Sequence, residues 1–250
     1  MRLVREHTRD LAVRSAPQQR EYEAIADRIK ADAPGRLLDW GCGLGQVTVQ
    51  LARRDLDVTS YDWLPDTPEP VTRPLDLFPE HEATFWSEPV ALPYPDDAFD
   101  AVLSCGVLEH VHDPDGSLEE LKRILKPGGT LYVYKLPNRF SYLEWIARRI
   151  GTIYWHGKEP NDRLYDVRSA RAIVERHGYA VQELRHANML PLTLPGALAS
   201  RLADVIWHAN RLVAKIPGLN RLATNVELVA TAPAKAATPA AAPAQASARS

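Results

Sequence analysis

A glycine-rich turn after an apolar run is the segment of this 250-residue sequence with the clearest chemistry. Residues 37–46 read LLDWGCGLGQ, and Gly41, Gly43 and Gly45 allow backbone conformations that other residues avoid. A helix after this turn would offer unpaired N–H groups to an anionic ligand. Asp62 ends the next apolar run, where a carboxylate can accept hydrogen bonds from both ribose hydroxyls. The pattern predicts a site for a nucleoside-containing cofactor.

The spacing of the glycines and one acidic residue narrow the kind of cofactor. Dinucleotide-binding turns prefer their third glycine one residue later than Gly45, and Gln46 occupies that position here. Asp39 lies two residues before the first glycine, where its carboxylate would suit the ammonium of an amino-acid moiety and would repel a pyrophosphate. A cofactor with an amino-acid part therefore fits this turn better than a dinucleotide does.

Four motifs carry a resemblance to a known family. Residues 38–45 are similar to the first motif of the class I S-adenosylmethionine-dependent methyltransferases. Residues 92–102 (LPYPDDAFDAV) resemble the segment that leads into that family's fourth strand, and residues 107–111 (VLEHV) resemble the segment directly after that strand. Residues 123–131 (RILKPGGTL) resemble the turn before the fifth strand. The similar subgroup is the type 11-like group, which includes small-molecule enzymes of ubiquinone and natural-product pathways.

The resemblance implies S-adenosyl-L-methionine as the cofactor. Asp39, Gly41 and Gly43 would line its methionine end, Asp62 would hold the ribose, and Trp63 would lie against the adenine. The full set of expected cofactor-binding residues is Tyr22, Asp39, Gly41, Cys42, Gly43, Gly45, Gln46, Asp62, Trp63, Glu88, Pro89, Ser104 and Cys105, with Arg20 as an alternative to Tyr22 at the carboxylate. The sequence departs from the family at Glu88, where an aspartate usually meets the adenine amino group.

Two histidines are candidates for a catalytic base, which methyl transfer needs only when the acceptor must lose a proton. His110 follows the predicted fourth strand, and His156 lies where this family builds its acceptor pocket. Each has a structural alternative: His110 could pack the start of a helix, and His156 could be a surface-loop residue. Nearby aromatic residues are candidates either for the wall of the pocket or for plain core: Tyr142, Trp145, Tyr154, Trp155 and Tyr165.

The expected activity is transfer of a methyl group, at oxygen, to a small-molecule, glycan or lipid-linked acceptor. A non-catalytic subunit that binds S-adenosylmethionine as a regulator or partner is the alternative from another class. A more remote alternative is an NAD(P)-dependent oxidoreductase, because Tyr154 and Lys158 have short-chain dehydrogenase spacing with Ser141 upstream. That chemistry needs both side chains on one helix face, and Gly157 and Pro160 disfavour such a helix.

Apolar runs and helix-period segments alternate along the chain, which predicts an α/β fold with a Rossmann-like parallel sheet. We expect six parallel strands and a last antiparallel strand, at 36–40, 57–61, 83–87, 99–104, 129–135, 179–186 and 225–231, with helices on both faces. The helices fit best at 20–32, 45–54, 117–126, 140–150 and 167–177, the last capped by Asp166. Five prolines between Pro65 and Pro79 predict a loop in place of a regular helix.

The domain organisation predicted is an extension at 1–19, one methyltransferase domain at 20–231 and a disordered Ala/Pro-rich tail at 232–250. Residues 188–224 form a helical insertion before the last strand, with apolar residues at helical spacing opposite basic ones. This insertion could cap a pocket, form a homodimer contact, or make peripheral membrane contact through residues 196–216.

Composition excludes several classes of protein. With 45% hydrophobic and 25% charged residues, the chain is neither fibrous nor wholly disordered. A net charge of −2 argues against a nucleic-acid partner, and Cys42 and Cys105 are too few for a disulfide scaffold or a zinc site, so no metal is expected. Without an apolar run of signal-peptide or membrane-span length, we expect a cytoplasmic protein, with the inner face of the membrane as the alternative location.

Overall fold

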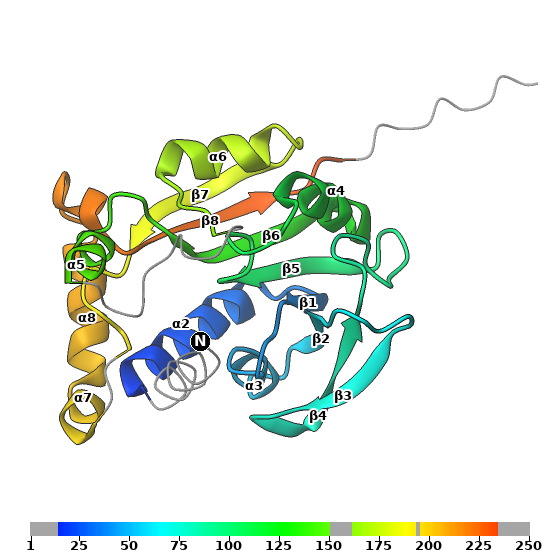
Figure 1. Ribbon diagram of the computed structural model, residues 1–250, viewed down its shortest axis with the longest axis horizontal. Helices are drawn as coiled ribbons and strands as arrows, with labels where there is room; N and C mark the ends of the chain where they lie inside the picture. The colour runs from blue at the N-terminus through cyan, green and yellow to red at the C-terminus, as the bar shows by residue number, and fades with distance from the viewer. Residues whose placement is uncertain (1–14, 151–161, 194–195, 235–250) are drawn as a thin grey trace, which may run out of the picture.

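One mixed β-sheet with helices on both faces forms the centre of the computed structural model, which describes residues 15–150, 162–193 and 196–234 (Figure 1). Within these ranges the sheet has eight strands in the order β3-β4-β2-β1-β5-β6-β8-β7. The strands are β1 (Arg36–Trp40), β2 (Asp57–Trp63), β3 (Val71–Leu75), β4 (Phe78–Trp86), β5 (Phe99–Cys105), β6 (Leu125–Pro137), β7 (Ala180–Ala187) and β8 (Asn225–Thr231).

The strand directions confirm the predicted architecture. Strands β4, β2, β1, β5 and β6 are parallel neighbours, and β8 runs antiparallel to both β6 and β7. Six strands therefore share one direction and the last strand opposes them, as the alternation in the sequence predicts; the eighth strand, β3, also runs antiparallel, beside β4. The carboxyl ends of the parallel strands consequently meet at one edge of the sheet, which is where open α/β sheets bind their ligands.

The prediction of a loop over Pro65–Pro79 was wrong in one respect, because β3 lies inside it. This strand forms a hairpin with β4 at the edge of the sheet, with a shift of register between Pro74 and Leu75. A proline cannot donate a ladder hydrogen bond, but an edge strand leaves one side unpaired and tolerates it. The prolines exclude a helix here, as expected, but they do not exclude an edge strand.

The described helices are α2 (Ala16–Asp32), α3 (Thr48–Ala52), α4 (Pro114–Ile124), α5 (Tyr142–Ile150), α6 (Val167–Glu175), α7 (Ala197–Arg201), α8 (Ala203–Val213) and the 3-10 turn η1 (Leu219–Leu222). Helices α2, α4 and α6 begin at residues whose side chains cap them, whereas α3, α7 and α8 begin without a side-chain cap. Asp166 caps α6 as predicted, in a reciprocal pair with Ser169. Helix α4 starts before the predicted residue 117, because Asp113 caps it and Pro114 fits its first turn. Helix α2 likewise starts at Ala16, capped by Ser15.

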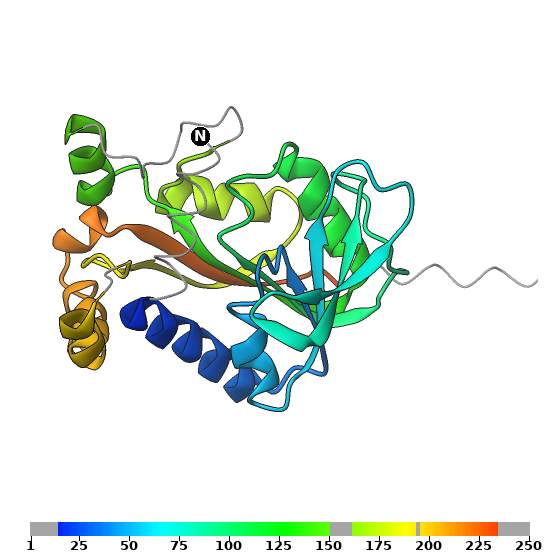
Figure 2. The same ribbon diagram turned by 60° about the horizontal axis from the view of Figure 1, so that its bottom comes forward.

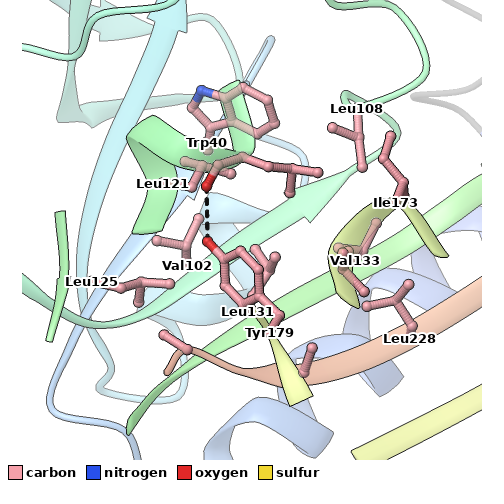
Figure 3. Close-up of a cluster of buried hydrophobic side chains, with 14 of the residues drawn as sticks. Trp40, Val102, Leu108, Leu121, Leu125, Leu131, Val133, Ile173, Tyr179 and Leu228 are labelled. Atoms are coloured by element: carbon pink, nitrogen blue, oxygen red, sulfur yellow. Dashed lines mark hydrogen bonds between the residues drawn. The ribbon is translucent and has the colours of Figure 1, made fainter. Parts of the chain in front are cut away.

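Alternating side chains on the central strands fill two hydrophobic layers. Leu38, Val102 and Leu131 belong to a cluster with the buried side chains of α4 and α6, and Figure 3 shows Val102 and Leu131 in it. The Tyr179 hydroxyl, in the same cluster, donates a hydrogen bond to the Leu118 carbonyl. The strand neighbours of Leu38, Val102 and Leu131 pack against α2 and α3 on the opposite face, in a cluster with Ile25, Ile29, Leu37, Leu51, Leu103 and Tyr132. Both faces of the sheet are therefore anchored, which fixes the loops at its carboxyl edge.

The predicted insertion is helical. Its helices α7 and α8 lie beside α2 at one end of the molecule (Figures 1 and 2). Arg20 of α2 forms an ion pair with Asp204 at 3.0 Å, and its guanidinium lies 4.5 Å from the centre of the Trp207 ring. None of the described helices is both long and apolar enough to cross a membrane. Most of the predicted extension at 1–19 and of the tail at 232–250 lies outside the described residues.

Candidate functional site

The glycine turn and the end of β2 meet at the carboxyl edge of the sheet. Trp40 is in register with Tyr61 of β2 and with Ser104 of β5, so the residues after these three positions emerge together. The backbone N–H of Gly43 donates a 2.7 Å hydrogen bond to Asp62 Oδ2. The structure thus brings together the glycine turn and the acidic residue that the sequence singled out.

Positive φ angles at all three glycines give the turn its shape, but the glycines serve different purposes. A Cβ on Gly41 would lie 2.4 Å from Val107, and one on Gly45 would lie 2.9 Å from Leu75, so both positions need the close approach that glycine allows. A Cβ on Gly43 would meet no heavy atom within 4 Å. The turn therefore leaves open space at Gly43, as a backbone cradle for a ligand requires.

The end of β2 presents a carboxylate beside an exposed aromatic ring. Asp62 Oδ1 accepts a 2.7 Å hydrogen bond from the backbone N–H of Trp63, which fixes the orientation of the carboxylate. The Trp63 side chain is half exposed, and its indole Nε1 donates to the Ser87 carbonyl at 2.8 Å. Glu88 and Pro89, both exposed, follow directly after Ser87. These residues lie together where the ribose and adenine are expected.

Asp39 is a buried carboxyl group beneath the glycine turn. Its Oδ2 accepts a 2.6 Å hydrogen bond from the Thr48 hydroxyl, which also lies 3.2 Å from the Ser60 hydroxyl. Burial raises the pKa of Asp39 to about 6, and the neighbouring charge of Asp62 adds to the shift. A nearby cationic group would stabilise the ionised form of such a carboxyl. The ammonium or sulfonium of S-adenosylmethionine fits this requirement.

The end of β5 carries buried polar atoms of a kind that a ligand could satisfy. Among the described residues, Ser104 Oγ has no hydrogen-bond partner although it is fully buried. Burial also raises the pKa of the Cys105 thiol, which is therefore neutral, as is Cys42 in the glycine turn. Burial is the largest cause of this shift, and the charges of Lys135, Asp39, Glu21 and Glu109 act on the Cys105 thiol as well.

Tyr22 lies at the same edge but is covered by a residue that the sequence did not single out. Its ring is buried, and Lys135 Nζ lies 4.7 Å from the ring centre and 3.4 Å from the Tyr22 hydroxyl. Lys135, at the end of β6, has a φ of 65°, which is unusual for a residue other than glycine. Arg20, the alternative to Tyr22, is directed instead to the insertion.

His110 forms a hydrogen-bonded pair with an aspartate that is distant in sequence. His110 Nδ1 lies 2.8 Å from Asp162 Oδ1, and the imidazole is half exposed. Arg163 anchors the aspartate's segment, because its backbone N–H donates to the Glu109 carbonyl at 3.0 Å and its guanidinium donates to the His112 carbonyl. Sequence reasoning missed Asp162, since nothing in the motif order places residue 162 beside residue 110.

Glu109 was also missed, although it belongs to a quoted motif. Its side chain is buried, its Oε1 lies 3.8 Å from His110 Nε2, and burial raises its pKa to about 7. Glu109 is recognised as a candidate because it is a buried acid beside a histidine, and only the structure shows that it is buried. His156, Tyr154 and Trp155 lie outside the described residues. Of the other candidate aromatics, Tyr165 is buried in the core and Trp145 is exposed.

Comparisons with known proteins point to one class of enzyme. A sequence model of the family described as "Methyltransferase domain" matches residues 13–184. The chain is 34% identical over 145 residues to a ubiquinone biosynthesis O-methyltransferase of Cereibacter sphaeroides, covering 53% of this chain and 57% of that protein. It is 31% identical to an uncharacterized methyltransferase of Mycobacterium tuberculosis, covering 62% and 60%.

Solved structures with low sequence identity share the fold. An S-adenosylmethionine-dependent methyltransferase of Thermotoga maritima, described as a possible histamine N-methyltransferase, superposes with a TM-score of 0.55 at 18% identity, covering 92% of this chain and 97% of that one. The family match spans more than half of the chain. The fold and site define a Rossmann-like methyltransferase domain. The chain belongs to the class I S-adenosylmethionine-dependent methyltransferase family.

The chain matches only part of the length of its curated relatives. The chain spans little more than half the length of the first relatives it matches, 57% and 55%. Their acceptors therefore do not transfer to this chain directly, and the residues of the site itself decide which acceptor fits.

Proposed function

We propose that this protein transfers a methyl group from S-adenosylmethionine to a hydroxyl oxygen of a small-molecule, glycan or lipid-linked acceptor. The observation that carries the proposal is the pairing of His110, which follows β5 at the same sheet edge as the glycine turn and Asp62, with Asp162 from the segment before α6. A hydroxyl acceptor must lose a proton, and this pair supplies a suitable base.

The residues proposed to hold the donor are those that the sequence predicted. The turn at Gly41, Gly43 and Gly45 would hold the methionine end together with Asp39, and Asp62 would accept hydrogen bonds from the ribose. Trp63, Glu88 and Pro89 would flank the adenine, and Tyr22, Cys42, Gln46, Ser104 and Cys105 would complete the surroundings. When bound, S-adenosylmethionine supplies an electrophilic methyl group on a sulfonium whose departure as a thioether needs no proton.

The protein's own part in the reaction is to orient the acceptor and to receive its proton. A hydrogen bond from His110 Nδ1–H to Asp162 fixes the tautomer in which Nε2 is the proton acceptor. The Asp162 carboxylate would then stabilise the imidazolium that forms. A positioned base of this kind contributes on the order of 10²–10⁴ in rate. His156 stays a second candidate for this base.

The chemistry of the acceptor follows from the charges near the base. The carboxyl groups of Asp162 and Glu109 flank the His110 imidazole: Asp162 Oδ1 lies 2.8 Å from Nδ1, and Glu109 Oε1 lies 3.8 Å from Nε2. An acceptor with hydroxyl groups suits these oxygens better than an anionic one does. The relative from Cereibacter sphaeroides is named as an O-methyltransferase, which supports transfer to oxygen. Contact of residues 196–216 with a membrane would favour a lipid-linked acceptor over a free one.

The test separates binding from transfer. Calorimetry should show S-adenosylmethionine binding by the wild type and equally by His110→Ala. Tritiated methyl transfer into a cell extract should label a product with the wild type and fall by about 100-fold or more with His110→Ala. His112→Ala, an exposed histidine two residues away, is the matched control and should retain activity. Binding without any labelled product would show a non-catalytic subunit and contradict the proposal.

A further inference from the structure

Large apolar side chains are exposed along one face of the insertion. Leu198, Leu202, Val205, Leu212 and Ile216 are all exposed, with Leu198 at 71%, Val205 at 61% and Leu212 at 67%. Val205 and Leu212, seven residues apart, share one face of α8; Leu198 in α7 and Leu202 between the two helices precede them at spacings of four and three, and Ile216 follows in the turn after α8. We call these five residues the apolar stripe.

The opposite side of the same helix is the side that holds the insertion to the protein. Asn210 is buried, and its side-chain oxygen accepts a 2.5 Å hydrogen bond from the backbone N–H of Leu190. Trp207 lies against Arg20 of α2, which also pairs with Asp204. The apolar stripe is therefore not needed to attach α8 to α2, and its exposure requires another explanation.

More apolar surface lies at the same end of the molecule. Helix α5 and the residues before it expose Phe140, Trp145 and Ile146, and η1 exposes Leu219 and Leu222. Figures 1 and 2 both show α5, α7, α8 and η1 at one end of the molecule. This is the end toward which β6 and β7 run, since α5 follows β6 and the insertion follows β7. It is therefore on the side of the sheet where the proposed site lies.

The charges around the apolar stripe indicate what covers it. Residues 196–224 contain the basic residues Arg201, Arg211, Lys215 and Arg221 and only one acidic residue, Asp204. The Asp204 carboxylate is already paired with Arg20, so the basic groups are not balanced within the insertion. An apolar stripe flanked by basic side chains complements a bilayer that carries anionic headgroups, because the stripe enters the acyl boundary while the cations remain at the headgroups.

We propose that the apolar stripe docks this protein on the surface of an anionic membrane, with α5 as a second contact. Docking in this orientation turns the carboxyl edge of the sheet toward the bilayer. A lipid-linked acceptor could then reach the site without crossing water. The docking itself does not depend on the proposed methyl transfer, so it can be tested without an acceptor.

The experiment is flotation of the purified full chain with vesicles. Wild type should float with phosphatidylcholine vesicles that contain phosphatidylglycerol, and much less with phosphatidylcholine alone or at high salt. The triple variant Leu198→Ser, Val205→Ser, Leu212→Ser should bind at least about tenfold more weakly. Arg201→Gln and Lys215→Gln should each weaken binding about fivefold.

Controls keep the outcome interpretable. Leu77→Ser changes an exposed leucine next to β4, far from the insertion in the fold, and should float like the wild type; Leu212→Ser alone is its matched counterpart. Unchanged S-adenosylmethionine affinity in the triple variant would show that it folds. Equal flotation of wild type and triple variant, or no flotation of wild type, would overturn the proposal. So would a wild-type dimer in sedimentation velocity that the triple variant loses, since a second copy would then cover the stripe.

Discussion

The two halves of the candidate site are built in different ways. The glycine-turn half, formed by residues 41–45 with Asp62 and Trp63, is held by glycine conformations and by hydrogen bonds from the Gly43 and Trp63 backbone N–H groups to the Asp62 carboxylate. The histidine half, formed by His110, Glu109 and Asp162, is held by a side-chain contact between residues 52 positions apart. The first half is therefore encoded locally, whereas the second depends on tertiary packing.

The difference shows why the donor is easier to infer than the acceptor. A cradle made of backbone has the same chemistry in any chain that forms the turn, so it recurs with the fold. A base oriented by a distant carboxylate, and a docking stripe on an insertion, can change without disturbing the sheet. Substitutions in each half of the site test this comparison.

The largest effect is expected from the backbone of the glycine turn. Gly41→Ala should lower the free energy of unfolding by about 2–5 kcal/mol, because the new Cβ meets Val107 and the positive φ disfavours alanine. Gly43→Ala should cost only about 1–2 kcal/mol in stability, since its Cβ meets nothing. Urea unfolding of both variants measures the difference, and equal losses would mean that the two glycines do not differ in purpose.

Asp62→Ala should weaken S-adenosylmethionine binding by about 100-fold or more. It removes the proposed acceptor of two ribose hydrogen bonds and also frees the Gly43 N–H that Asp62 orients. Calorimetry is the measurement. Asp57→Ala, at the exposed start of the same strand, is the control and should bind as the wild type does. Unchanged affinity in Asp62→Ala would refute the ribose assignment.

In the histidine half, Asp162→Asn should lower the transfer rate about 10- to 100-fold while leaving S-adenosylmethionine affinity unchanged. The amide keeps the shape but no longer stabilises an imidazolium at His110. A loss of cofactor affinity equal to the loss of rate would mean that Asp162 only supports the fold.

Glu109 should make stability depend on pH. Its pKa is raised by burial from 4.5 to about 7 in the folded protein, so the folded state holds a proton that the unfolded state releases. The free energy of unfolding therefore falls as pH rises from about 4.5 to about 7, because the folded chain then holds a proton that the unfolded chain has released. Glu109→Gln should raise the free energy of unfolding at pH 8 by about 1–2 kcal/mol relative to wild type, and not at pH 4. Urea unfolding at both pH values is the check, and an equal change at both would contradict the assignment.

The smallest effect is expected at the departure from the family pattern. Glu88→Asp restores the usual aspartate, but Glu88 is exposed and its longer side chain can still accept the adenine hydrogen bond. The affinity for S-adenosylmethionine should therefore change by less than about threefold, since one exposed hydrogen bond contributes little. A tenfold gain in calorimetry would show that the glutamate weakens adenine binding and that this position limits the glycine-turn half.

Local patterns predicted much of the fold. The seven expected strands are present, and Asp166 caps its helix, because apolar alternation and side-chain caps act over a few residues. The edge strand β3 was missed because proline density excludes helices more strongly than it excludes edge strands. The positive φ of Lys135 and the shift of register between Val133 and Leu136 could not be predicted, because residues 130–136 of this strand contain no glycine or proline that would indicate a bulge.

The candidate site was predicted unevenly for the same physical reason. The glycine turn and Asp62 could be placed together because consecutive parallel strands end at the same edge. The partner of His110 could not be found, because Asp162 reaches it only through the packing of the segment that Arg163 anchors. Tyr22 was expected to face the cofactor, but no local pattern indicates that Lys135 covers its ring.

A structure with bound S-adenosylhomocysteine would show whether the two halves of the site face one reaction centre. We expect ribose hydroxyls on the Asp62 carboxylate, the amino group near Asp39, and the thioether sulfur directed toward the His110 imidazole. A nucleoside bound away from Asp62, or a sulfur directed away from His110 with another base in its path, would contradict the shared reaction centre.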